Sequence, residues 1–452
     1  MTNSPQHENT HEHLRLLTGN LDSGALSQIK RQVNELHPAE IANLLESLPL
    51  QHRRIVWELT NPELAGDILV EVNDEVRQGL IEHTDEKDLI TAAVSLETDD
   101  LADIFEDLPQ AVLHQVVRSM SNQDRRRLQS VMSYDEDSAG GLMNPDVVTI
   151  RPNVDLDVVL RYLRQRGELP ANTDKLFVVD REDRYLGILN ISDLLTQSKK
   201  ESVSRVMLTD QKALPPSLSA NEVALFFEDY NLLSAPVVDE KNHLLGRITV
   251  DDVVDVIRDE ADRSILNLAG LDEDDDMFAP VTRSAKRRAV WLGINLFTAF
   301  LAAWVIGLFA ATIQQIVALA VLMPIVASMG GIAGSQTLML VIRGIALNQI
   351  GKSNSRWLLW KELAVGGLNG LLWASVVAVI TALWFQNQAL GLLIGAALVI
   401  NFIGAALAGA TIPLTLKRLN IDPAIAGGVI LTTVTDVIGF FSFLGLAALF
   451  LT

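Results

Sequence analysis

The chain has 452 residues, a formal net charge of −20 and no cysteine. This length suggests about three domains, and the lack of cysteine excludes disulfides, thiolate metal sites and a cysteine nucleophile. An acidic balance of this size repels phosphate groups, so we expect cations as ligands and no nucleic acid.

Charge and hydropathy divide the chain into two parts. From Arg283 onward it contains ten Lys and Arg residues against three Asp and Glu, whereas the preceding part contains 26 basic and 53 acidic residues. The preceding part has no apolar stretch long enough to cross a bilayer, and its amino terminus has no hydrophobic signal region. We therefore expect it to remain in the cytosol.

The amino-terminal residues 1–20 are polar and predict a disordered tail. Within this tail His7, Glu8 and His11 match the H-E-x-x-H metalloprotease motif. That chemistry needs both histidines on one buried helical turn beside a third ligand, which a polar tail does not offer. The sequence therefore favours a protein that is not an enzyme.

Residues 21–137 alternate short amphipathic helical patterns with breaks. HPAEIANLLESLP at 37–49 recurs as ETDDLADIFEDLP at 97–109, an offset of 60 residues. Repeated helical units that cannot bury their apolar faces alone predict an acidic, all-α superhelical domain.

Residues 138–257 contain the clearest repeat. LFVVDREDRYLGILNISDLL at 176–195 matches APVVDEKNHLLGRITVDDVV at 235–254, which aligns Asp180 with Asp239 and Gly187 with Gly246. Both copies predict a strand, a charged turn, a second strand and a helix opened by an aspartate. This pattern resembles a tandem pair of cystathionine-beta-synthase (CBS) domains, α/β modules that sense small ligands. A nucleotide on the pair stays open, since no phosphate-cradling glycine loop is present.

Residues 283–452 predict an α-helical membrane domain. A bilayer demands about 20 apolar residues per helix. Lys and Arg gather before the first apolar segment, between the second and third, and between the fourth and fifth, which places the amino terminus inside and the carboxy terminus outside. The five predicted spans are residues 289–312, 316–342, 358–385, 390–416 and 424–451.

Two of these spans carry candidate ion-binding groups. In the second, Pro324 removes a backbone donor and Gly330 and Gly331 permit a bend, so we expect a broken helix with carbonyls free to coordinate a cation. In the fifth, Asp436 lies within an otherwise uncharged segment. A carboxylate there costs about 2.5–3.5 kcal/mol and marks an ion route. The segment TTVTD predicts a polar patch within one helical turn, formed by Thr432, Thr433, Thr435 and Asp436.

The order of these parts resembles the MgtE family of bacterial magnesium channels across nearly the whole chain. The residues that carry the resemblance are YDEDSAGGLM at 134–143, the CBS pair, PIVASMGGIAGSQ and DPAIAGGVILTTVTD. The resemblance implies a homodimer in the bacterial inner membrane, with a pore between subunits that is lined by the second and fifth membrane helices. Asp436 would then select a hydrated Mg²⁺, with Thr432, Gly330 and Gly331 as further pore residues. Chemistry agrees, since Mg²⁺ prefers oxygen ligands and the membrane part contains no histidine for softer metals.

The resemblance also implies regulation by cytosolic Mg²⁺, which would bind between the helical domain, the CBS pair and a linker. This linker, residues 258–282 with a helix near 258–278, would act as a plug. The matching acidic positions are Asp99, Asp103, Asp252, Asp255 and Glu260.

Several positions depart from the family pattern. Ile332 and Ser335 stand where family members often have asparagine. Other residues replace expected acids, so the sensor would bind fewer ions, bind them more weakly, or use the run 272–276 instead. The replaced acids are at Ser219, Asn221, Arg263 and Ser264.

Alternative functions stay open from the residues alone. A broader Mg²⁺ and Co²⁺ transporter with weakened sensing uses the same ligand types, and a proton- or sodium-coupled carrier is not separated from a channel. Selection against Mn²⁺ and Ni²⁺ is equally open. A membrane-anchored CBS sensor without transport would not explain Asp436.

Overall fold

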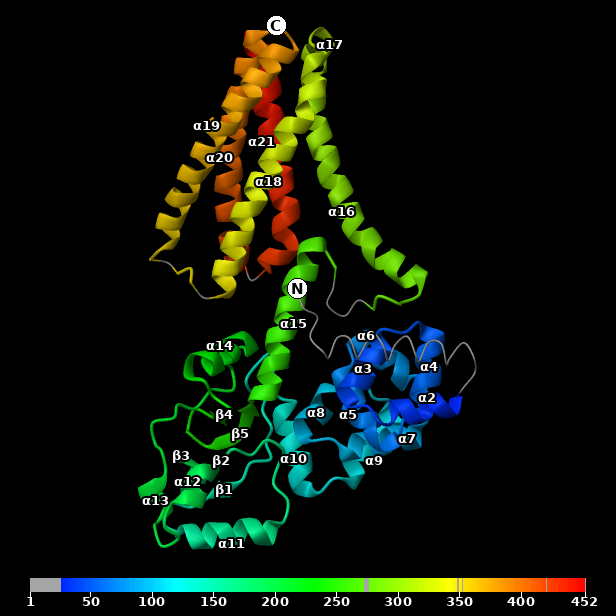
Figure 1. Cartoon of the computed structure of the whole chain (residues 1–452), viewed down its shortest axis with the longest axis vertical. Helices are drawn as coiled ribbons and strands as arrows, with labels where there is room; N and C mark the ends of the chain where they lie inside the picture. Colours follow the sequence, from blue (N-terminus) through cyan, green and yellow to red (C-terminus); the bar gives the residue numbers. More distant parts are fainter. Residues whose placement is uncertain (1–25, 272–275, 348, 352, 420, 452) are drawn as a thin grey trace. The chain divides into compact units, whose positions relative to one another are not determined.

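The structure is a computed structural model that describes residues 26–271, 276–347, 349–351, 353–419 and 421–451. It divides into two compact units. One contains the described residues up to Asp262 together with 276–280, and the other contains 263–271 and the described residues from Val281 onward (Figure 1). The predicted tail 1–20 and its H-E-x-x-H motif lie outside the described residues.

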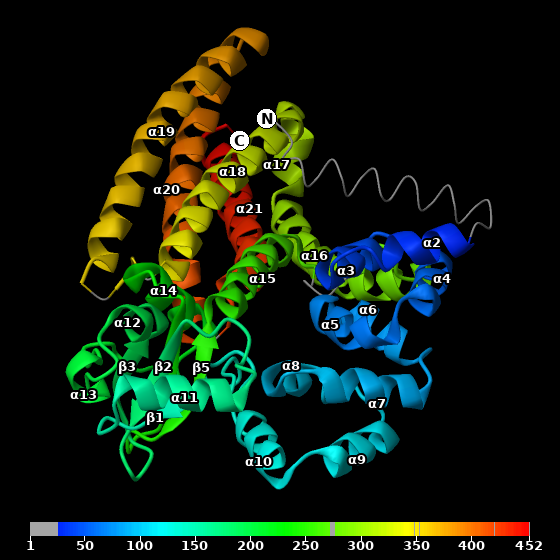
Figure 2. The same ribbon diagram turned by 60° about the horizontal axis from the view of Figure 1, so that its bottom comes forward.

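The first unit begins with a stack of short helices. Packing follows the chain, since α2 contacts α4, α3 contacts α5, α5 contacts α7 and α7 contacts α9 (Figure 2). This arrangement is the predicted helical superhelix. The elements are α2 (Leu26–Val33), α3 (Pro38–Glu46), α4 (Leu50–Leu59), η1 (Pro62–Leu64), α5 (Ala65–Glu71), α6 (Asp74–Ile81), α7 (Glu86–Ser95), α8 (Thr98–Asp103), α9 (Gln110–Ser119) and α10 (Asn122–Val131).

The 60-residue repeat explains the core of this domain. Three pairs of apolar residues at equivalent positions are buried in both copies: Ile41 and Leu101, Leu44 and Ile104, and Leu48 and Leu108. Such matched burial requires neighbouring helices on both sides of each copy, which a superhelix supplies.

The second repeat forms two strand pairs with their helices. Strand β2 pairs antiparallel with β3 with Val178 opposite Gly187, and β4 pairs antiparallel with β5 with Val237 opposite Gly246. The repeat therefore gives the same register twice, and the predicted tandem α/β pair is confirmed. The elements are β1 (Thr149–Ile150), α11 (Leu156–Arg166), β2 (Lys175–Val179), β3 (Tyr185–Asn190), α12 (Ile191–Thr196), α13 (Val203–Val206), α14 (Ala220–Tyr230), β4 (Ser234–Val238) and β5 (Leu244–Thr249).

The turns of the two hairpins have the same design. Asp180 accepts hydrogen bonds from the backbone amides of Glu182 and Arg184, at 2.8 and 3.0 Å. Asp239 does the same for Lys241 and His243, at 2.8 and 2.7 Å. The aligned aspartates are thus turn residues, which explains their recurrence without a ligand.

Helix α15 (Val250–Ala269) continues from the second CBS repeat into the linker. It ends at Gly270, whose φ of +70° suits glycine, and a side chain there would overlap the Trp291 indole. The predicted linker helix at 258–278 was therefore wrong at both ends. Residues 277–279 form a turn before the next helix begins at Val281.

The second unit is a bundle of long apolar helices. Five described helices are long and apolar enough to cross a membrane, as predicted. Figures 1 and 2 show α20 between α18, α19 and α21, while the first half of α16 diverges from the others. The helices are α16 (Val281–Gly307), the short α17 (Ala310–Gln315), α18 (Ala318–Ala346), α19 (Ser355–Trp384), α20 (Gln388–Arg418) and α21 (Pro423–Phe450).

The predicted break in the second span was wrong, because α18 is one continuous helix that includes Pro324. Proline removes only the hydrogen bond to the Ala320 carbonyl. The glycines serve close packing instead, since a side chain at Gly330 would overlap Asn401 and one at Gly334 would press on Leu431.

Candidate ion-binding sites

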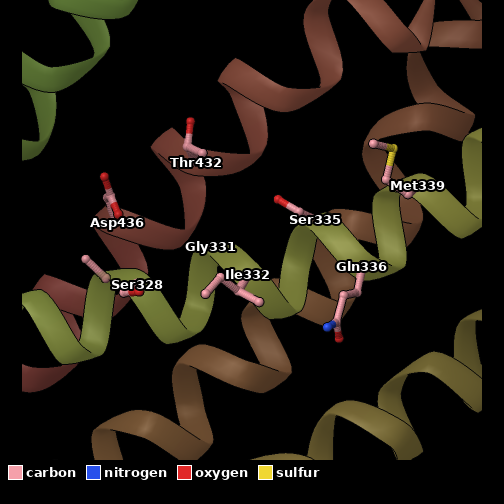
Figure 3. Close-up of a pocket in the computed structure, with 9 residues that line it drawn as sticks. Ser328, Gly331, Ile332, Ser335, Gln336, Met339, Thr432 and Asp436 are labelled. Carbon is pink, nitrogen blue, oxygen red and sulfur yellow. The ribbon is translucent and has the colours of Figure 1, made fainter. Parts of the chain in front are cut away.

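An open pocket of about 700 Å³ lies on the membrane unit between α18 and α21, the second and fifth long helices (Figure 3). Helical spacing accounts for its lining. Ser328, Gly331 and Ser335 recur at three- and four-residue intervals on one face of α18, and Thr432 and Asp436 are four residues apart on α21. The lining residues are Ala327, Ser328, Gly331, Ile332, Ser335, Gln336, Met339, Thr432 and Asp436.

The Asp436 carboxylate is the one charged group in this lining. It is half-buried, and no hydrogen bond or ion pair to it is found among the residues that the structure describes. Thr432 donates its hydroxyl proton back to carbonyls of its own helix, at 3.1 Å from Gly428 and from Val429, which leaves its oxygen able to accept. Serine hydroxyls and the Gln336 amide add further oxygen atoms, the ligand type of hard cations, to a lining that also contains Ala327, Ile332 and Met339.

The structure separates other predicted pore residues. Gly331 lines the pocket with open space beside it, whereas Gly330 lies outside the lining and faces Asn401. Thr435 is buried and bonded to the Thr432 carbonyl at 3.0 Å, so the predicted four-residue patch is divided. Ile332 and Ser335, where the resemblance leads one to expect asparagine, both line the pocket.

Carboxylates of α8 and α15 lie close enough in the first unit to repel one another. Loss of hydration, followed by repulsion from Asp100 and Asp252, raises the pKa of Asp99 to about 8. Loss of hydration is also the main reason that the pKa of Asp103 rises to about 7 and that of Asp252 to about 6. In addition, Asp99 Oδ1 is buried and has no hydrogen-bond partner in the described part of the chain. These groups lie where a cation would relieve both burial and repulsion.

Asp255 and Glu260 lie further along α15. Loss of hydration and the neighbouring Glu71 of α5 raise the pKa of Asp255 to about 6, while Glu260 is half-buried on the next turn. Among the described residues, no group of three or more His, Asp or Glu is arranged to hold a metal ion. Some of the predicted regulatory residues thus lie close enough to repel other carboxylates, but the described residues are not already arranged as a set of metal ligands.

Two acids in this region were not among the predicted site residues. The pKa of Asp100 rises to about 6 through loss of hydration and then repulsion by Glu97 and Asp67. Glu97 accepts hydrogen bonds from the Asn144 side chain and from the Ala171 amide, and so links the helical domain to the CBS pair. The run of acids around α8 is visible in the sequence and points to this region. The partners of Glu97, Asn144 and Ala171, are 47 and 74 residues away and could not be inferred from it.

Ser219 occupies a position where an acid is expected. It caps α14 by accepting from the Glu222 amide at 3.4 Å, and its hydroxyl donates to the Glu222 carboxylate at 3.0 Å. Serine therefore fulfils the capping role of an aspartate without its charge.

The run 272–276 was an alternative sensor. Residues 272–275 lie outside the described residues, and for Asp276 the prediction was wrong. Its two carboxylate oxygens are 2.8 and 3.1 Å from the Arg53 guanidinium, and both side chains are buried. Arg53 also donates to the Leu45 carbonyl at 2.8 Å. This ion pair already satisfies the charge of Asp276, so the residue is not a free Mg²⁺ ligand.

The end of α15 contacts the start of α21 within the membrane unit. Asn267 Nδ2 donates to Asp422 Oδ2 at 3.0 Å, while Asp422 Oδ1 accepts from the Ala424 amide at 2.8 Å and caps α21. One carboxylate therefore connects the last turn of α15 to the helix that carries Asp436.

Comparison with known proteins agrees with this architecture. Three family models match: "MgtE intracellular N domain" at residues 36–137, "CBS domain" at 139–200 and 203–259, and "Divalent cation transporter", the MgtE model, at 323–446. The magnesium transporter MgtE of Bacillus subtilis (strain 168) is 29% identical over 95% of this chain and 96% of its own length. That of Thermus thermophilus is 29% identical over 95% of this chain and 97% of its own.

A solved structure also matches part of the chain. It is the cytosolic domain of the Mg²⁺ channel MgtE in complex with ATP, with 28% identity, a TM-score of 0.48 and coverage of 53% of this chain and 98% of that one. The matches to the three family models, in the order in which the domains follow one another, and to full-length relatives show that this multi-pass membrane protein belongs to the MgtE family.

Proposed function

We propose that the chain forms a homodimeric Mg²⁺ channel, with the ion path at the pocket between α18 and α21. The observation that carries this proposal is Asp436, which has no partner among the described residues and lies beside hydroxyl groups in an open pocket of a membrane domain. Mg²⁺ retains several waters and binds through one or two carboxylates, which such a pocket accommodates.

A second copy of the chain completes this site. Hydroxyls, an amide and a carboxylate on an open helix face cannot be left against hydrocarbon without a large cost. Apposition of two copies would cover both pockets and place two Asp436 carboxylates on one path. Two repelling carboxylates favour a divalent cation over a monovalent one.

The charge distribution supports one orientation in the bacterial inner membrane. Arg283, Lys286 and Arg288 lie near the start of α16, and Lys417 and Arg418 end α20. Their placement on the cytosolic side puts the first unit in the cytosol and the end of α21 outside.

Cytosolic Mg²⁺ would regulate this path through the carboxylates of α8 and α15. Binding near Asp99, Asp103 and Asp252 would hold the two helices together, with Asp255 and Glu260 contributing further along α15. The contact between Asn267 and Asp422 gives α15 a direct connection to α21. Because Ser219, Asn221, Arg263 and Ser264 replace expected acids, closure would need more Mg²⁺ than in a fully acidic relative.

A flux assay in liposomes tests the transport itself. Purified full-length protein is reconstituted, and uptake of Mg²⁺, Co²⁺, Mn²⁺ and Ni²⁺ is measured with and without a proton gradient. Channel activity predicts Mg²⁺ flux that does not require the gradient. A complete lack of cation flux would favour the membrane-anchored CBS sensor.

The raised pKa values predict that Mg²⁺ protection depends on pH. Protons bind the carboxylates of Asp99, Asp103 and Asp252 more tightly in the folded protein than in the unfolded chain. Their stabilising contribution is therefore complete below the unfolded pKa of about 4. It is lost as the pH rises through the folded values of about 6 to 8. Without Mg²⁺, contact between α8 and α15 should weaken over this range, and Mg²⁺ should restore it.

Limited proteolysis of the full-length protein over a Mg²⁺ titration measures this effect. Protection should need less Mg²⁺ at about pH 8 than at about pH 6, because protons compete with the cation. Ca²⁺ and matched ionic strength are the controls. Ser219→Asp keeps a capping side chain and restores the acid, so it should lower the Mg²⁺ requirement. Identical digestion at every Mg²⁺ concentration would show that this sensor is absent.

A further inference from the structure

Asn401 is a buried polar side chain at the meeting point of α18, α20 and α21. Its exposed fraction is 0%, and its Nδ2 donates to the Val326 carbonyl of α18 at 2.9 Å. Its Oδ1 is buried and has no hydrogen-bond partner in the part of the chain that the structure describes. The opposite amide orientation would set Oδ1 against the Val326 carbonyl oxygen, so the donor assignment follows from the surroundings.

Two glycines make room for this amide, one on each pocket helix. A Cβ at Gly330 of α18 would overlap the Asn401 side chain. A Cβ at Gly439 of α21 would lie 2.7 Å from Asn401 Nδ2 and 3.1 Å from a Val326 methyl. Both helices therefore approach the same side chain more closely than any other residue type at these glycines allows.

This contact lies directly behind the pocket. Val326 and Gly330 are on the buried face of α18, and the following residues, Ala327 and Gly331, are on the face that lines the pocket. On α21, Gly439 is three residues after Asp436. The Asn401 amide thus touches both pocket helices close to the segment of α21 that carries Asp436.

We propose that Asn401 is a positioning residue that sets the spacing of α18 and α21 across the pocket and so the width open to a hydrated cation. The proposal rests on the pocket being the ion path. Selection among divalent cations depends on cavity size and on how much water the ion retains. An apolar side chain at this position could be buried without leaving a hydrogen-bond acceptor unsatisfied. Burial of the Asn401 amide costs free energy that packing alone does not require.

The test uses full-length protein in liposomes and the ratio of Mg²⁺ to Ca²⁺ flux. Asn401→Ala should change this ratio by about threefold or more, the equilibrium equivalent of one interhelical hydrogen bond in a membrane. Asn295→Ala is the matched control, because among the described residues the Asn295 amide donates to the Trp291 carbonyl of its own helix alone, at 3.0 Å. The control should leave the ratio unchanged.

A second pair of variants tests the close approach itself. Gly330→Ala should reduce flux because its methyl group collides with the amide, and Gly330→Ala combined with Asn401→Ala should recover flux by vacating that space. The double variant keeps the test decisive if Asn401→Ala alone does not fold.

Each outcome has one meaning. An unchanged ion ratio in a folded Asn401→Ala protein, undisturbed flux in Gly330→Ala, or equal defects in the single and double Gly330 variants would overturn the role of Asn401. Flux that survives Asp436→Ala would instead remove the proposed ion path, whatever the Asn401 variants do.

Discussion

Replacement of Asp436 by Ala or Asn should abolish Mg²⁺ flux and the rescue of a magnesium-auxotrophic bacterium. Asn preserves the shape of the side chain and removes its charge, so the two variants should behave alike. Loss of a charged partner at a partly buried site costs about 3–5 kcal/mol, which corresponds to at least about a hundredfold in flux if ion binding limits it. Normal rescue by either variant would remove Asp436 from the mechanism.

Two threonines of α21 provide a matched pair, in which Thr432 is the test position and Thr435 is the control. Thr432 lines the pocket, whereas Thr435 is buried away from it and bonds to its own helix. Thr432→Val should lower flux because it replaces an oxygen in the lining with a methyl group. Thr435→Val should leave flux close to that of the parent. A loss of flux in both would point to the helix packing rather than to the pocket.

Much of this architecture was predictable because it depends on local spacing. The repeats with offsets near 60 residues gave the superhelix and the CBS pair, since each copy places its apolar residues and turn aspartates in the same way. Thr432 and Asp436 are four residues apart, so a helix must present them on one face. These relations depend on local spacing and do not require knowledge of contacts with distant parts of the chain.

Other features depend on the rotation of a helix within the bundle, which spacing does not determine. Pro324 and the glycines of α18 predicted a break, but neighbouring helices stabilise a continuous helix and use the glycines for contact. Gly330 and Gly331 are adjacent in sequence, and packing on Asn401 decides that only Gly331 lines the pocket. Asn401 itself bonds to a carbonyl 75 residues away.

Long-range ion pairs are hidden from sequence reasoning for the same reason. The run 272–276 looks like a solvated acidic loop with free carboxylates. Asp276 nevertheless pairs with Arg53, which is 223 residues away. The local sequence carries no signal of that partner, and the pair changes the role of Asp276 from a candidate ligand to a structural contact.

Breaking this buried pair should produce the largest loss of stability outside the membrane unit. Asp276 lies between α15 and α16 in sequence, and its backbone amide also donates to Glu75 of α6 at 3.2 Å. Arg53→Met leaves the Asp276 carboxylate buried without its charge partner, which costs about 3–5 kcal/mol. Hydrogen exchange of peptides from α3, α4 and residues 276–280 in the full-length protein should speed up by at least about a hundredfold if they exchange by opening this region.

Two comparisons isolate the cause of that loss. Arg31 and Glu35 form an exposed ion pair at 3.1 Å in the same domain, and Arg31→Ala should change stability by less than about 1 kcal/mol. Arg53→Met combined with Asp276→Leu replaces the buried charges with apolar groups and should recover much of the protection, since no charge is left unpaired. If Arg53→Met speeds exchange no more than Arg31→Ala does, the ion pair does not hold residues 276–280 to the helical domain. If it does, those residues, which directly precede the first membrane helix, are bound to the domain that carries the proposed Mg²⁺ sensor.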